Sequence, residues 1–257
     1  MLVLLAPSEG KTAPPAGSAP VDLERLAFPQ LAPQRAQLIA KLTRVANGNP
    51  KRALAALGLS AGQAAEIERD RDLLGAPAAP AAEVYSGVLY QHLDLASLTA
   101  PQRRRASERM LVASALWGVV GLDDRIPAYR LGIGASLPRT KGLAAWWKPA
   151  LTKALPADAL VLDLRSQAYA SAWRPPRGEV VEVRAFVDAG GKRTPVSHMA
   201  KAIRGEVARM VARAAKAPES PEQAAALVEA AGERVELTPP AKPGAAWRLD
   251  VLRATAV

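Results

Sequence analysis

A short polar stretch near the start of the sequence, PSEGKT at residues 7–12, has residue types that can bind an anion. Its last three residues match the end of the phosphate-binding P-loop pattern, Gly-x-x-x-x-Gly-Lys-[Ser/Thr]. However, Leu5 stands where the first glycine belongs, and two prolines soon follow where a P-loop needs the first turn of a helix. We therefore expect an ordinary loop after an apolar strand, with Lys11 and Thr12 facing either an anionic ligand or solvent.

Three further sites have residue types suited to chemistry. Tyr129 and Arg130 could stack on a base and bind a phosphate, although a core tyrosine beside a surface arginine is the alternative. Asp163 comes near the end of an apolar stretch, where it could act in a site or bind a backbone amide. Lys201 and Arg204 are three residues apart in a predicted helix and would share one basic or simply solvated face.

The composition favours some functional classes and excludes others. Lysine and arginine number 34 against 24 acidic residues, and the formal net charge of +10 favours nucleic acids or phosphorylated ligands as partners. The absence of cysteine excludes disulfides and thiolate metal sites, and two histidines make a multi-histidine metal centre improbable, while a carboxylate metal site stays possible. We predict no metal site and no cofactor. No long apolar run predicts a membrane span, and no basic segment precedes the first apolar residues as in a signal peptide. We expect a cytoplasmic monomer with no membrane partner.

The elements that position these residues begin with a helical unit at 28–75. Helices are predicted at 34–46, 51–58 and 60–75, because apolar residues recur at helical spacing between turn residues. Two helices joined by a short glycine-bearing turn have the form of a helix-hairpin-helix module, whose turn amides bind DNA phosphates without reading bases. The turn residues here are Gly58, Ser60 and Gly62.

Apolar stretches alternate with helical patterns along the rest of the chain. We predict strands at 2–6, 113–120, 159–166, 179–188 and 245–253, helices at 100–114, 142–155 and 197–216, and a turn at DAGGK, 188–192. A sheet interleaved with helices predicts the α/β (α+β mixed) class. Since no internal repeat is visible, we expect a single compact domain over 1–257, with a mixed central sheet, surrounding helices and the helix-hairpin-helix-like segment.

The chain resembles the YaaA family of peroxide-stress proteins in six stretches that follow the family's order. They are APSEGKT (6–12), EVYSGVLY (83–90), ALWGVVGLDDRIPAYRLGIG (115–134), TKGLAAWWKPALTKAL (140–155), VLDLRSQAY (161–169) and HMAKAIRGEVARM (198–210). The resemblance implies a compact α/β fold with a helix-hairpin-helix-like segment and a positively charged cleft. It also implies duplex DNA binding and survival of hydrogen peroxide through limited free iron.

The resemblance also implies which residues form the site. With Thr12 added from the first loop, the anion- or nucleic-acid-binding residues would be Lys11, Thr12, Tyr129, Arg130, Lys141, Trp147, Tyr169, Lys201 and Arg204. The candidate catalytic residues, with Asp163 added from the strand end, are Lys11, Tyr85, Asp163, Ser166 and Lys201. The first loop departs from the shorter Pro-x-Lys-Thr of other members, and the C-terminal region matches the family poorly.

Two functions follow as hypotheses. The first is a stress protein that binds duplex DNA through phosphates and limits iron-driven damage indirectly, since a chain without cysteine is a poor iron chelator. The alternative is an enzyme that acts on a nucleotide or another phosphorylated small molecule in a basic cleft. Convergence of Lys11, Arg130, Lys141 and Lys201 in one cavity would favour the enzyme.

Overall fold

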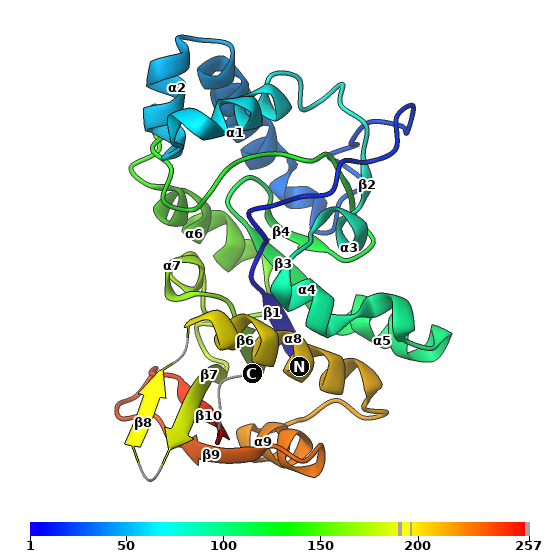
Figure 1. Cartoon of the computed structure of the whole chain (residues 1–257), viewed down its shortest axis with the longest axis vertical. Coiled ribbons are helices and arrows are strands. Elements are labelled where there is room, and N and C mark those ends of the chain that lie inside the picture. The colour runs from blue at the N-terminus through cyan, green and yellow to red at the C-terminus, as the bar shows by residue number, and fades with distance from the viewer. Residues whose placement is uncertain (190–191, 196, 255–257) are drawn as a thin grey trace.

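A mixed sheet of eight strands runs through the computed structural model, which describes residues 1–189, 192–195 and 197–254 (Figure 1). The strand order is β4-β3-β1-β6-β7-β10-β9, and β8 pairs with β7 beside this path. The bounds are β1 Leu2–Leu5, β3 Met110–Ser114, β4 Gly118–Gly121, β6 Val161–Leu164, β7 Val180–Ala189, β8 Lys192–Pro195, β9 Arg234–Thr238 and β10 Trp247–Arg253. β2 (Ala79–Pro80) and β5 (Arg125–Ile126) form a separate antiparallel pair. The predicted mixed α/β class, in a single domain, is confirmed.

The apolar strand β1 lies inside the parallel part of this sheet, which runs β3-β1-β6-β7-β10. It pairs in parallel with β3 on one side and with β6 on the other, and its residues Val3, Leu4 and Leu5 are fully buried. A strand covered on both faces reads as a continuous apolar run, as LVLL does. The carboxyl ends of β1, β3 and β6 therefore meet at one edge of the sheet, where ligands bind in many α/β proteins.

The predicted helical unit forms one end of the molecule, at the top of Figure 1. It contains η1 (Pro29–Leu31), α1 (Ala32–Ala46), α2 (Pro50–Leu57) and the 3-10 helix η2 (Ala61–Asp70). Gly58 ends α2 with a φ of +67°, and extended Ser60 precedes η2 as its N-cap. The order helix, short turn, helix is confirmed, although the third helix is shorter than predicted and wound as a 3-10 helix.

The remaining helices lie along the sheet. They are α3 (Ala81–Val84), α4 (Val88–Leu93), η3 (Leu95–Ser97), α5 (Ala100–Arg109), α6 (Leu143–Ala154), α7 (Gln167–Ala170), α8 (Ser197–Arg213) and α9 (Pro221–Ala230). Helix α8 packs against β7, α4 and α5, and Figure 1 shows these three helices side by side. Within the described residues, no helix is long and apolar enough to cross a membrane.

Two predictions in the middle of the chain were wrong. The helix predicted at 100–114 ends at Arg109, because MLVAS at 110–114 is buried along its whole length and joins the sheet as β3. The single strand predicted at 113–120 is a β3–β4 hairpin, which turns at 115–117. Gly118 makes the turn possible with a φ of +75°, and an added Cβ would lie 2.8 Å from the Trp147 ring. Of the predicted DAGGK turn, Gly190 and Gly191 lie outside the described residues.

A buried arginine fastens the helical unit to this hairpin. Arg35 of α1 is fully buried and donates to the carbonyl oxygens of Trp117 (3.1 Å) and Val119 (2.9 Å). It also donates to those of Ala27 (2.8 Å) and Phe28 (3.4 Å). One guanidinium thus satisfies backbone acceptors from two distant segments, which fixes α1 against the β3–β4 hairpin.

Replacing this arginine should weaken the whole domain. Arg35→Met keeps much of the side-chain volume but leaves the four carbonyl groups without this donor, so we expect a loss of at least about 3 kcal/mol in the free energy of unfolding. Exposed Arg44 on the same helix gives the control, and Arg44→Met should change that free energy by less than about 0.5 kcal/mol. Urea unfolding of both variants makes the comparison, and equal effects would contradict the anchoring role of Arg35.

Candidate functional site around Lys11

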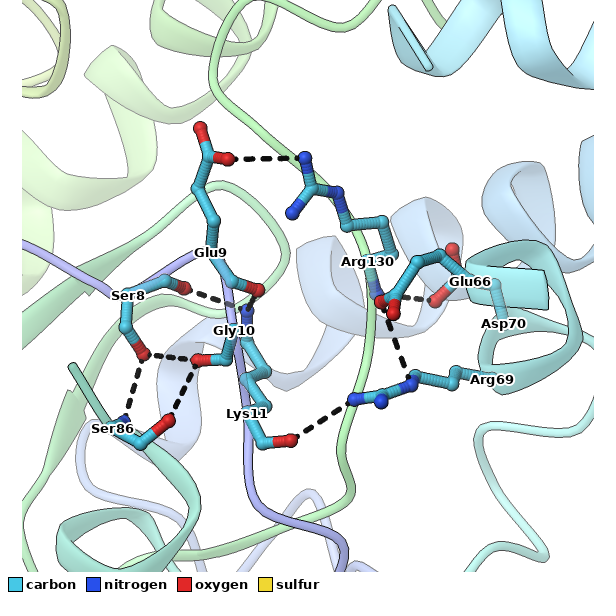
Figure 2. Close-up of polar contacts among 9 residues, drawn as sticks. All are labelled: Ser8, Glu9, Gly10, Lys11, Glu66, Arg69, Asp70, Ser86 and Arg130. Atoms are coloured by element: carbon cyan, nitrogen blue, oxygen red, sulfur yellow. Dashed lines mark hydrogen bonds and ion pairs between the residues drawn. The ribbon is translucent and has the colours of Figure 1, made fainter. Parts of the chain in front are cut away.

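Lys11 lies in the loop after β1, with its side chain folded back over its own loop (Figure 2). Its Nζ donates to the carbonyl oxygens of Ser8 (2.9 Å) and Glu9 (3.4 Å), and the residue is only 8% exposed. A segment distant in the sequence, at 84–86, holds the loop in place. Thr12 donates its amide to the Val84 carbonyl, and Ser86 donates its amide to Ser8 Oγ.

Two tyrosine rings form the wall against which the Lys11 amine lies. Nζ is 4.1 Å from the ring centre of Tyr129 and 5.5 Å from that of Tyr85. The two phenol oxygens are 2.9 Å apart, and Tyr129 also shares a 2.7 Å hydrogen bond with Ser114 at the end of β3. Ser114 Oγ accepts the amides of residues 116 and 117, so the hairpin turn fixes this hydroxyl chain.

The end of η2 brings an acidic residue to the same place. Asp70 is fully buried, and its Oδ1 accepts the backbone amide of Arg130 at 2.8 Å. Its other oxygen, Oδ2, is buried and has no hydrogen-bond partner in the structure. Arg69, one residue earlier, donates to the carbonyl oxygen of Lys11 at 3.1 Å, so η2 is bound directly to the loop after β1.

Burial moves the pKa values of the Lys11 amine and the Asp70 carboxyl group toward neutral pH. Loss of water and, to a lesser extent, the positive charge of Arg130 lower the pKa of Lys11 to about 7, against the opposing effect of Asp70. Burial raises the pKa of Asp70 to about 7, while the Arg130 amide and the Lys11 charge act in the opposite direction. Burial also raises the pKa of Tyr85 and of Tyr129 well above 10, which keeps both phenols protonated. Such shifted groups gathered in one place are typical of functional sites.

The outer side of the site has charges of both signs. Arg130 forms a 3.2 Å ion pair with Glu9, whose side chain is 83% exposed, whereas that of Arg130 is only 16% exposed. Glu66 pairs with Arg69 at 3.5 Å beside them. Acidic and basic groups therefore alternate around Lys11, and the basic cleft implied by the family resemblance stays a prediction.

Comparison with known proteins decides the family. A sequence profile described as peroxide stress protein YaaA matches residues 1–231. This chain belongs to the YaaA peroxide stress protein family. A UPF0246 protein of Streptomyces coelicolor is 44% identical over 257 residues, covering 98% of each chain. One from Corynebacterium glutamicum is 37% identical, covering 93% of this chain and 96% of its own. One from Polynucleobacter asymbioticus is 29% identical, covering 82% and 85%.

Several residues selected by the family resemblance lie in or beside this cluster. Lys11, Tyr85, Tyr129 and Arg130 meet directly. The charges of Glu9 and Arg130 act on Tyr169, and burial raises its pKa to about 12. Asp163 forms a buried 2.7 Å ion pair with Arg165, whose guanidinium also reaches the Tyr169 carbonyl. Exposed Ser166 caps α7 at the same sheet edge.

Other selected residues lie apart or have a structural place. Trp147 is fully buried and donates its indole N–H to the Ala115 carbonyl, so it has no surface for a ligand. Arg204 of α8 donates to the Val183 carbonyl at 3.3 Å. Lys141 and Lys201 are exposed, and the described contacts join neither of them to Lys11. Thr12 is exposed beside Lys11. Of the four cations whose convergence would favour an enzyme, Lys11 and Arg130 lie in one cluster, and the convergence of the other two stays a prediction.

Two residues at the centre of the site, Asp70 and Ser114, were not selected from the sequence. Asp70 is one of several acids in ERDRD, and nothing in its spacing separates it from Asp72, which is exposed. Ser114 was placed at the end of a helix and within a strand, so its position at a hairpin turn was not foreseen. Among the described residues, no group of three histidines, cysteines or acids could hold a metal ion. The prediction of no cofactor remains untested.

The buried carboxyl group of Asp70 should make the free energy of unfolding depend on pH, and the substitution Asp70→Asn should remove this contribution. The pKa is raised in the folded state, so folding favours the protonated acid, and the free energy of unfolding falls as pH rises from about 4 to about 7. In Asp70→Asn this fall should shrink by up to about 4 kcal/mol, at about 1.4 kcal/mol for each pH unit. Urea unfolding at several pH values measures it, with the exposed Asp72→Asn as control. An unchanged pH profile in Asp70→Asn would contradict a neutral buried acid.

Proposed function

We propose that this chain takes part in the peroxide stress response by binding duplex DNA through the α2–η2 hairpin. The hairpin turn supports this proposal best. Gly58, Ser60, Ala61 and Gly62 are all exposed, whereas Leu59 between them is buried and ties the turn to α2 through the Leu54 carbonyl. The Gln63 amide donates to the Ser60 carbonyl, and the Ser60 amide donates to the Gln63 side chain. The amides of Ala61 and Gly62, at the positive end of η2, are therefore the ones that could bind a phosphate.

The chemistry of the chain agrees with DNA as the ligand. A net charge of +10 attracts a polyanion over long range, and turn amides contact phosphates without selecting a base sequence. Binding should therefore be steeply salt-dependent and weakly sequence-specific. Because the chain has no cysteine, its effect on iron-driven damage would be indirect, through the DNA that it covers.

A second candidate function, an enzyme acting on a nucleotide or another phosphorylated small molecule, has its own support. Lys11 and Arg130 lie beside three tyrosines at the carboxyl edge of β1, the usual ligand position in such sheets. Equilibrium dialysis with ATP tests it: binding that is lost in Arg130→Gln and kept in Lys148→Gln would support this site. Absence of ATP binding to the unchanged protein would count against a nucleotide ligand.

If the hairpin binds DNA, a negative charge added at the hairpin turn should lower DNA affinity more than the same charge added elsewhere. Ala61→Glu places a carboxylate at the first residue of η2, where it repels a phosphate yet suits a helix N-terminus, so DNA affinity should fall at least about fivefold. Exposed Ala145→Glu on α6 makes the same change in net charge away from the hairpin and should change affinity less than about twofold. Gel-shift titrations on one duplex at two salt concentrations compare the two variants. Equal losses would show diffuse binding instead of hairpin binding.

A further inference from the structure

We propose that the Lys11 amine condenses with the aldehyde of an abasic site in DNA. The protein would then recognise damaged strands by forming a covalent bond with them. The inference rests on the proposed DNA binding, and it assigns Lys11 a reaction that phosphate binding does not need. A lysine amine is a nucleophile toward carbonyl groups once it has lost its proton.

A neutral Lys11 amine can make all the hydrogen bonds that the structure gives it, although the two tyrosine faces favour its charged form. Nζ has two acceptors, the carbonyl oxygens of Ser8 and Glu9, and a neutral amine has two N–H donors. Within the part of the chain that the structure describes, no ion pair joins Lys11 to Asp70 or Glu9. A buried charge without a paired carboxylate is costly, and the amine avoids that cost by giving up its proton. The free lone pair of the amine then points away from both carbonyl groups.

The surroundings of Lys11 provide both means by which proteins activate a lysine. One is removal of water, here by the Tyr129 and Tyr85 rings and by the loop itself. The other is a neighbouring cation, here Arg130. Together they lower the pKa of Lys11 to about 7, so about half of the amines are neutral at that pH.

Arg130 indicates that the carbonyl compound has an anionic group. Its guanidinium is paired with the carboxylate of Glu9, an exposed side chain on a surface loop. The Glu9 carboxylate is in water while the Arg130 side chain is mostly buried, so an incoming anion can take the place of Glu9 beside Arg130. A phosphate suits the same guanidinium equally well. The ligand would therefore place a carbonyl carbon at Lys11 and a phosphate at Arg130.

An abasic site in DNA meets both requirements. Intact duplex DNA contains no aldehyde, whereas a deoxyribose that has lost its base opens to an aldehyde flanked by two phosphates. The missing base also reduces the space needed beside the tyrosine rings and the cost of moving the sugar out of the helix. Glu9 and Gly10, which cover the amine, are themselves exposed, so the cover is a single loop.

The 3-10 helix η2 connects the hairpin turn, which is proposed to bind DNA, to the loop that contains Lys11. η2 begins at the hairpin turn and ends at Asp70, and Arg69 near its end binds the Lys11 carbonyl. Ten residues of 3-10 helix span about 20 Å, which corresponds to a few base pairs along a duplex. A hairpin bound to one phosphate would thus hold the strand while the amine meets a sugar farther along it.

The reaction balances without an oxidant or a reductant. The nitrogen lone pair of Lys11 attacks the aldehyde carbon to give a carbinolamine. The carbon–oxygen bond then breaks and a carbon–nitrogen double bond forms. The hydroxyl leaves as water with the protons that the amine loses, so the products are one imine and one water. Added water reverses the step and restores the lysine.

Reductive trapping tests this step. The full-length protein is mixed with a duplex containing one abasic site, sodium cyanoborohydride is added, and covalent complexes are separated on a denaturing gel. Peptide mass mapping of the unchanged protein should place the adduct on Lys11. Lys11→Arg should lower the trapped yield at least about tenfold, and exposed Lys148→Arg should leave it within about twofold. Glu9→Gln should raise the yield, because it frees Arg130.

A duplex with a tetrahydrofuran abasic analogue separates binding from chemistry, because the analogue has the same shape but no aldehyde. It should shift in a native gel yet give no trapped complex. An adduct on other lysines, or no adduct while the native shift persists, would overturn the imine and leave DNA binding intact. If neither duplex shifts in the native gel, both the imine and the proposed DNA binding are overturned.

Discussion

The exclusion of water from the Lys11 amine is the constraint on which the site depends. Segments far apart in the chain achieve it together: the loop after β1, Tyr85 before α4, and Tyr129 after β5. Each segment is fixed by a contact that has another purpose in the fold. Ser114 holds Tyr129 while it closes the β3–β4 turn, and Asp70 holds the Arg130 backbone while it ends η2. Disturbing any of these contacts would admit water and return the lysine to its ordinary charged state.

The position of the site would allow one fold to combine the proposed DNA contact with the proposed reaction of Lys11. Parallel pairing of β1 with β3 and β6 brings three strand ends to one edge, and the helical unit closes over that edge. Arg35 fastens this unit to the sheet through backbone carbonyl groups, so its place does not depend on surface charges. The YaaA family model covers residues 1–231, which include the Lys11 loop, the hairpin and Arg130.

Local patterns in the sequence predicted much of the fold, while the centre of the site depended on long-range contacts. Gly58 and Ser60 marked the hairpin turn because a left-handed residue and a helix cap have strong sequence signals. The β3–β4 hairpin was missed because MLVASALWGVV is almost entirely apolar, and Ser114 alone does not distinguish a turn from a continuous strand. Asp70 was missed because burial, not spacing, distinguishes it from its acidic neighbours. Lys11 was selected correctly as part of the cluster, but its loss of charge depends on rings 74 and 118 residues away in the sequence.

The titration of Lys11 tests this account most directly. Protein grown with ¹³C-labelled lysine gives a Cε signal for each lysine, and the signal missing in Lys11→Arg identifies the one at Lys11. Its chemical shift, followed from pH 5 to pH 11, reports the charge on the amine. Burial and Arg130 should place the midpoint near 7, whereas exposed lysines titrate near 10.4. A Lys11 midpoint near 10.4 would show a hydrated, charged amine and would contradict the desolvated site.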